Sequence, residues 1–401
     1  MIEIQEAYAY LEQTFKQAPD RAQTMEIAVE DSLGHYLAEP VLAQYNSPPF
    51  NQSAMDGVAF RFHPEQRTYK VVGTIAAGDP PDAINPEMGC CVRIMTGAPV
   101  PSGADTVEMV ENVTFSGEEA FLEGQPRKGQ HIRICGENTA VGDVCYEPGM
   151  RVTAGVLAGL YSQGVRFIKV RRPLRVGIAA TGDELVGHYK PLQPGQIHNS
   201  NGPGLKALLG EAGIQILDLG VFPDETAATR DCLMANLDLD MIILSGGVSM
   251  GDFDQVPGAA KEAGFRQVFH KIRMKPGKPV WFGVHEKGTY LFGLPGNPVS
   301  VTVGALLFVQ PMLRALQTST FHQPAWITVP ITQATENKSR LTLFKGLLLE
   351  EGEGQMKVRP IETSGSGDLA HFSVLAALGR LSPGVRLNSG DEIQILLPFL
   401  R

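Results

Sequence analysis

The sequence predicts a multidomain α/β protein with a central, mostly parallel α/β domain, an elongated helical lobe carrying an inserted β-rich domain, and a C-terminal β-barrel-like domain. Two observations predict this class. Apolar, strand-like runs alternate with helix-like segments over residues 171–322, as in repeated βαβ units. Shorter β-like runs with glycine-rich turns occupy residues 48–133 and 323–401. A chain of 401 residues is also too long for one compact core.

The N-terminal segment predicts a helix, because one of its faces is apolar at three- and four-residue steps. These apolar positions are Ile4, Tyr8, Leu11 and Phe15. A second short helix is predicted over residues 31–40, and helical periodicity returns over residues 152–162. We therefore expect a helical lobe made of residues 1–47 and 134–170, with residues 48–133 inserted into it as a β-rich domain.

The segment 171–322 is expected to form the α/β domain. Strands are predicted at 176–180, 214–219, 241–244 and 290–294, and helices at 200–213, at 226–237 and after 298 to about 316. Ligands of such sheets lie outside the carboxyl ends of the strands. The last β-like runs, within 323–401, predict the small C-terminal β domain.

Composition and charge exclude several classes of protein. The formal net charge of −9 would repel a phosphate backbone, so no nucleic-acid partner is expected. The five cysteines form neither a CxxC pair nor a Cys/His cluster, which fits a reducing compartment. No signal-like N-terminus and no run of roughly 18 apolar residues is visible. We expect a cytoplasmic protein without a membrane partner.

Three strand-end loops combine small residues with polar or acidic ones. TGDEL covers Thr181–Leu185, SGGVSMGDFD covers Ser245–Asp254, and PGNP covers Pro295–Pro298. Adjacent glycines let successive N–H groups form a concavity that binds anions. The carboxylates suit a hard cation such as Mg²⁺. In addition, KPGKP places Lys275 and Lys278 on one proline-stiffened loop, where they could neutralise phosphate or another oxyanion.

Each motif also has a purely structural interpretation. TGDEL and KPGKP could be ordinary surface turns, Asp56 could form an Asx turn, and Thr96 could cap a turn. We expect His198 to hydrogen-bond locally rather than act as a base. The full SGGVSMGDFD string favours function, because two glycines and two acids crowd one strand end. No Ser/His/Asp arrangement, GxGxxG or GxxxxGK[ST] motif occurs where it would be needed, so dinucleotide redox and P-loop chemistry are not expected.

Seven motifs, taken in order, resemble the molybdopterin molybdenumtransferase family, which also supplies the C-terminal part of gephyrin. They are PPFNQSAMDGVA, RIMTGAPVPSGADTV, GEN, TGDEL, SGGVSMGDFD, KPGKP and GLPGNPVS, and they span nearly the whole chain. The resemblance implies that residues 171–322 bind molybdopterin and that the protein is a homodimer whose clefts draw on both subunits. It also implies insertion of molybdate into adenylated molybdopterin with Mg²⁺ or another divalent cation, which releases AMP.

The resemblance assigns site residues to this chain. Catalytic roles are implied for Asp56, Thr96, Glu184 and Asp254, and the three acids among them would hold the cation or position water and molybdate. Substrate contacts are implied for Arg133, Thr181, Gly182, Asp183, Asp224, Ser245, Gly246, Gly247, Ser249, Lys275, Lys278, Pro295, Pro298 and Ser366. The lysines would hold oxyanions, and residues 245–247 would receive the terminal phosphate of the pterin.

The chain departs from the family pattern at a few positions. These are Asn51 and Gln52 in place of Asp-Asn, Val58 in place of tyrosine, Asn138 in place of aspartate, and Leu378 in place of asparagine. The lost acids keep a second hypothesis open, in which the chain is a molybdopterin-binding scaffold with reduced turnover. A third hypothesis is the preceding adenylyltransferase step. Transient contact with the adenylyltransferase or with molybdoenzyme chaperones is a further expectation from the resemblance.

Overall fold

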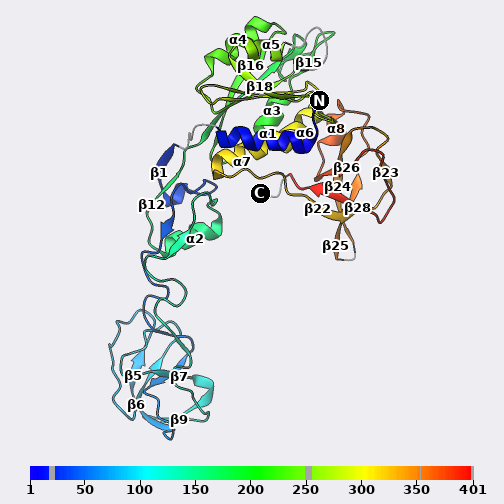
Figure 1. Cartoon of the computed structure of the whole chain (residues 1–401). Coiled ribbons are helices and arrows are strands. Elements are labelled where there is room, and N and C mark those ends of the chain that lie inside the picture. Colours follow the sequence, from blue (N-terminus) through cyan, green and yellow to red (C-terminus); the bar gives the residue numbers. More distant parts are fainter. Residues whose placement is uncertain (18–22, 249–254, 353, 399–401) are drawn as a thin grey trace.

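The computed structural model describes residues 1–17, 23–248, 255–352 and 354–398. Three large sheets organise this part of the chain, and the molecule is elongated (Figure 1). The α/β domain and the C-terminal sheet lie together at one end. A thin region leads from them to a separate β-rich domain at the other end. The multidomain α/β class predicted from the sequence is confirmed.

The central six-stranded sheet has the order β16-β13-β17-β21-β20-β18. These strands are β16 (Ile214–Phe222), β13 (Leu174–Thr181), β17 (Met241–Ser245), β21 (Tyr290–Leu294), β20 (Trp281–His285) and β18 (Phe265–His270). The first four run parallel, whereas β20 and β18 extend the edge in antiparallel pairing. All four strands predicted for this domain are present as the parallel part of the sheet. The antiparallel pair was not predicted.

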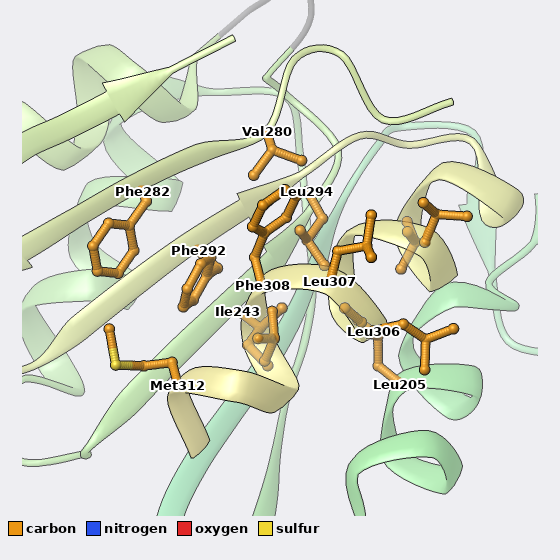
Figure 2. Packing of buried hydrophobic residues seen from close by; sticks show 14 of the residues in the cluster. Leu205, Ile243, Val280, Phe282, Phe292, Leu294, Leu306, Leu307, Phe308 and Met312 are labelled. Atoms are coloured by element: carbon orange, nitrogen blue, oxygen red, sulfur yellow. The ribbon is translucent and has the colours of Figure 1, made fainter. Parts of the chain in front are cut away.

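Helices pack on the faces of this sheet. They are α3 (Asn201–Leu209), α4 (Thr226–Ala235), α5 (Val256–Glu262), α6 (Pro298–Gly304), the π-helical turn Ala305–Val309 and α7 (Gln310–Thr318). Figure 2 shows Phe308 and Met312 of the last helical stretch packed against Phe282 and Phe292 of the sheet. Among the described residues only Pro298–Thr318 is long and apolar enough to cross a membrane, and 78% of its most apolar window is buried inside the molecule. It is a core helix of this domain.

Helix α1 (Ile4–Gln17) is present as predicted but packs in a different place. Its face with Ile4, Tyr8 and Leu11 belongs to the core of the α/β domain, and the rings of Tyr8 and Phe308 lie 5.6 Å apart. Assigning it to the helical lobe was therefore wrong. Periodicity shows that one face of a helix is apolar, but not which apolar surface it packs against.

The lobe contains one α-helix in its described part, α2 (Ala154–Ser162), whose N-terminus is capped by the Thr153 side chain. Beside it run the antiparallel pairs β1 (Thr24–Ala28) with β12 (Phe167–Arg171) and β2 (Val41–Leu42) with β11 (Val144–Tyr146). The helix predicted over 31–40 is wrong. A 3₁₀ turn at Val29–Asp31 is followed by irregular chain, because the Leu37 and Ala38 N–H groups donate to Met150 and Lys169 instead.

The β-rich domain is a six-stranded sheet of order β7-β4-β6-β5-β9-β8. Its strands are β4 (Gly57–Phe60), β5 (Thr68–Ile75), β6 (Cys90–Ile94), β7 (Thr106–Met109), β8 (Val113–Ser116) and β9 (Glu119–Leu122), with a 3₁₀ turn at Val110–Asn112. A short pair, β3 (Gln52–Ser53) with β10 (Ile132–Arg133), joins the two chain segments that enter and leave it.

The C-terminal sheet has the order β19-β24-β26-β28-β22, with β25 paired to β24. Its members are β19 (Met274–Lys275), β22 (Ile327–Pro330), β24 (Thr342–Gly352), β25 (Gln355–Pro360), β26 (Ala377–Leu381) and β28 (Glu392–Leu396). The remaining short elements are α8 (Leu369–Phe372), β23 (Thr335–Glu336), β27 (Arg386–Leu387), β14 (Leu185–Val186) and β15 (Ile197–His198). Strand β19 belongs in sequence to the α/β domain, so its pairing with β24 fixes the two domains to each other.

Candidate functional site

A cavity of about 980 Å³ lies where the carboxyl ends of the parallel strands face the C-terminal sheet. Its position is the one that a parallel sheet offers to ligands. Eight residues predicted to contact substrate or to act in catalysis line it: Thr181, Glu184, Ser245, Lys275, Lys278, Pro295, Pro298 and Ser366. Residues from strand ends far apart in the sequence therefore meet around one space.

The backbone turn after β17 is closely packed against the end of β13. Gly246 has φ of +107° and Gly247 has φ of +64°, a conformation that side chains rarely adopt. A Cβ atom at Gly246 would lie 2.5 Å from the Thr181 carbonyl oxygen. The Gly246 N–H donates to the Leu294 carbonyl at 3.0 Å, so the glycine turn joins the ends of three neighbouring strands.

Asn201, at the start of α3, is a pocket residue that the sequence analysis missed. Its amide nitrogen donates to Ser245 Oγ and to the Gly296 carbonyl, both at 2.7 Å. It thus fixes the serine of the glycine turn to the PGNP turn. The available signal was the SNG sequence directly before a helix, which was interpreted only as a helix start.

The basic side of the cavity contains a third lysine besides Lys275 and Lys278. The side chains of those two are exposed on the loop between β19 and β20. Lys345 of β24 lies opposite, is only 23% exposed, and pairs with Glu362 at 3.3 Å. Lysine side chains hold phosphate and other oxyanions as compact point charges. Lys345 was missed because it stands in an apolar strand without any motif.

The acidic side consists of Glu184, which lines the cavity, and of carboxylates near it on the loops that follow β13 and β16. The Asp224 N–H donates to Asp183 Oδ1 at 3.4 Å, and Glu184 lines the cavity. Burial, together with the charges of Glu184 and Asp183, raises the pKa of Asp224. Crowded carboxylates with hard oxygen donors suit a divalent cation, which would relieve their repulsion. No group of three metal-ligating side chains is already assembled among the described residues.

Three other predicted residues lie in the β-rich end of the molecule, away from the cavity (Figure 1). Asp56 Oδ1 accepts from the Thr96 N–H at 2.6 Å and from its hydroxyl at 2.8 Å, which lowers the pKa of Asp56. Arg133 donates to Glu137 at 2.8 Å and to Asn138 at 3.1 Å. Within one chain the structure does not bring these residues to the cavity. Ser249 and Asp254 lie outside the described residues.

The positions that depart from the family pattern have ordinary structural roles. Leu378 and Val58 are fully buried in apolar clusters, and the Asn51 side chain accepts from the Cys135 N–H at 2.9 Å. Gln52 pairs through its backbone with Arg133 in the β3–β10 ladder.

The fold and the cavity define a class: a multidomain α/β protein with a pocket at the carboxyl ends of parallel strands, lined by lysines and carboxylates and closed by a second sheet. Two family models match the chain, the MoeA N-terminal region (domain I and II) over residues 2–164 and a probable molybdopterin binding domain over residues 177–315. The molybdopterin molybdenumtransferase of Haemophilus influenzae is 37% identical over 362 residues, 88% of each chain. That of Bacillus subtilis is 34% identical, over 94% of this chain and 90% of the relative.

The chain therefore belongs to the molybdopterin molybdenumtransferase family, and the predicted enzyme class, a transferase, is confirmed. Its fold is also that of a solved structure, a molybdopterin biosynthesis moeA protein from Pyrococcus horikoshii OT3. The two share a TM-score of 0.83 at 24% identity, over 99% of this chain and 100% of the other.

Proposed function

We propose that this chain inserts molybdate into adenylated molybdopterin in the presence of Mg²⁺ and releases AMP. The observation that carries the proposal is the cavity that Ser245, three lysines and Glu184 line together. A phosphorylated pterin, an oxyanion and a cation need complementary groups of these kinds.

Each group of residues has a separate role that follows from its chemistry. The turn of residues 245–247 receives the terminal phosphate of the pterin, with donors other than the Gly246 N–H, which is bonded to the Leu294 carbonyl. Lys275 and Lys278 hold molybdate and stabilise the charge that develops on the departing AMP phosphate. Water supplies the oxygen when the phosphoanhydride bond breaks, so AMP leaves as a phosphate monoester. Molybdate exchanges oxygen ligands for the two sulfurs, which belong to the pterin.

The cation would be held by carboxylates on the acidic side, with Glu184, Asp183 and Asp224 as the donors present there. When bound, it would supply charge neutralisation for the phosphates. In the same proposal Asp254 of this chain and Asp56 of a second copy complete the set. Thr96 keeps Asp56 ionised, which suits a cation ligand better than a general acid.

A homodimer is part of the proposal, because Asp56, Thr96 and Arg133 cannot reach the cavity of their own chain as it is folded. Exposed apolar side chains in the lobe and in the segments that lead to the β-rich domain support a second copy as the occupant of that surface. They are Leu33, Leu42, Tyr45, Ile134, Val141, Val144, Tyr161 and Phe167. The cytoplasmic location and the contacts with an adenylyltransferase or with chaperones rest on the family resemblance alone.

Release of AMP tests the proposal directly. Purified protein with adenylated molybdopterin, Mg²⁺ and molybdate should release AMP, and omission of molybdate should slow the release. A parallel reaction with ATP and unadenylated molybdopterin should give no adenylation. Absence of AMP with any divalent cation, together with tight pterin binding in calorimetry, would instead support the scaffold.

A further inference from the structure

The loop 362–367, between β25 and α8, carries Ser366 across the gap between two domains. It belongs to the C-terminal domain in sequence and lines the cavity. Ser366 Oγ accepts from Asn297 Nδ2 at 2.9 Å, and the Ser366 carbonyl accepts from the Val299 N–H at 3.2 Å. Because the hydroxyl oxygen accepts this bond, its hydrogen can be donated to an oxyanion in the cavity.

The composition of this loop makes it costly to order. Its sequence, ETSGSG, includes two glycines and two serines, residues with large backbone freedom in the unfolded chain. Gly365 has φ of +144°. Some local interaction must hold such a segment if it is to present one hydroxyl in a fixed position.

Asp368 supplies that interaction at the C-terminal end of the loop. Its Oδ2 accepts from the Ser364 N–H at 2.9 Å and from the Ser364 hydroxyl at 3.0 Å. Its Oδ1 faces the Nδ1 atom of His371 at 2.8 Å and accepts from the His371 N–H at 3.3 Å. The Asp368 side chain is only 11% exposed. One carboxylate thus binds residues on both sides of Ser366.

Capping of α8 alone does not explain this geometry. The helix has four residues, and a cap requires only the bond from the His371 N–H. Helix α8 is instead fixed by Phe372, which is 2% exposed, contacts the cavity and packs over Gly346 of β24. Asp368 connects this anchored helix to Ser364, and so to the glycine- and serine-rich loop 362–367 that carries Ser366.

We infer, on the basis of the proposed function, that Asp368 is a positioning residue for oxyanion binding. It does not touch the substrate. Its carboxylate holds the backbone of loop 362–367 so that the Ser366 hydroxyl stays beside Asn297 at the cavity.

Substitution of Asp368 separates this role from simple folding. In Asp368→Asn one acceptor oxygen is lost, so either Ser364 or His371 is released. Hydrogen exchange of the amides at 363–367 should accelerate about tenfold or more, and the KM for molybdate should rise roughly tenfold while kcat changes less than about twofold. Asp368→Glu keeps both acceptor oxygens and should restore part of the loss.

Asp391→Asn is the matched control. Asp391 Oδ2 accepts from the Asn388 N–H at 2.7 Å in another turn of the same domain, and neither residue lines the cavity. In Asp391→Asn, hydrogen exchange of the amides at 363–367 and the KM for molybdate should equal those of the wild type. If Asp368→Asn unfolds, Ser364→Ala, which removes one of the contacts, gives the same comparison with a smaller effect.

Two results would overturn the inference: unchanged exchange in Asp368→Asn, or faster exchange with an unchanged KM. If the wild type releases no AMP, the proposed function fails separately. Calorimetry with molybdate alone then tests the role of Asp368. Equal affinity for molybdate in the wild type and in Asp368→Asn would exclude the positioning role.

Discussion

At Gly246 the turn beside the cavity leaves no room for a side chain. Replacement with alanine would place Cβ at 2.5 Å from the Thr181 carbonyl oxygen in a backbone conformation with φ of +107°. We expect Gly246→Ala to destabilise the protein by roughly 1–3 kcal/mol from backbone strain and to reduce AMP release strongly. Urea unfolding and the AMP assay measure the two effects.

Gly258→Ala is the control, since this glycine lies within α5 and a Cβ there would meet nothing within 4 Å. It should be neutral or stabilising by up to about 1 kcal/mol. Equal behaviour of the two variants would contradict the close approach at Gly246.

The pair Asp56 and Thr96 predicts a pH dependence. Both Thr96 donors bind the ionised carboxylate, so the pKa of Asp56 is lowered in the folded protein. The stability that this bond contributes is present above the unfolded pKa of about 3.9 and is lost as the pH falls through the lowered folded value. Thr96→Val removes the hydroxyl donor, so the pKa of Asp56 should rise and AMP release should decline at a higher pH on the acid side.

Carboxyl-detected NMR titration of Asp56 measures this change. Thr114→Val, which removes a hydroxyl bound to Glu123 in the same domain, should leave Asp56 unaffected. A pKa that stays constant in Thr96→Val would show that the backbone N–H alone sets it.

The residues of the candidate site could be predicted where a motif made them visible. Gly246, Lys275 and Lys278 were found in this way, because glycine pairs and proline-bounded lysines stand out locally. Asn201 and Lys345 could not be found, since their importance comes from partners on other elements. The oxygen that Asn201 binds on Ser245 is 44 residues away along the chain.

Among the elements, those with strong periodicity were predicted well and those determined by long-range pairing were not. The four parallel strands and the helix after Pro298 follow from apolar runs and turn residues. Strands β18 and β20 were missed because their place at the sheet edge depends on pairing with each other and with β21. The segment 31–40 has helical composition, but its Leu37 and Ala38 N–H groups donate to Met150 and Lys169 instead.

Helix α1 allows a test of its unexpected position. Leu11 is 0% exposed in the core of the α/β domain, so Leu11→Ala should lower the free energy of unfolding of that domain by about 2–5 kcal/mol. Glu12→Ala removes an exposed ion pair with Lys16 and should cost less than about 1 kcal/mol. Denaturant unfolding, followed by the near-UV signal of Trp281, measures the loss of stability in each variant. Trp281 is fully buried in β20 of the α/β domain. A small loss for Leu11→Ala would contradict the packing of α1 in this core.

At the scale of the whole molecule, the elongated shape separates two groups of predicted site residues. Asp56 lies in the β-rich domain and Lys275 lies at the cavity, and Figure 1 shows the β-rich domain at the opposite end of the molecule from the α/β domain. Joining them within one chain would require a large bend in the region that holds the β1–β12, β2–β11 and β3–β10 pairs. A second copy can bring Asp56 to the cavity without any such change, and the shared cleft then has a measurable consequence.

Mixing two inactive variants tests the shared cleft. Asp56→Asn and Lys275→Ala should each abolish most AMP release, because each removes a charged group from every cleft. When the two are unfolded together and refolded in equal amounts, about half of the dimers are mixed, and in each mixed dimer one of two clefts has both native residues. Activity should therefore return to about a quarter of the wild-type value. Lys261→Ala, an exposed lysine of α5 away from the cavity, should be active by itself and serves as the refolding control. If both residues acted within one chain, every cleft in the mixture would lack one of them, and no activity would return.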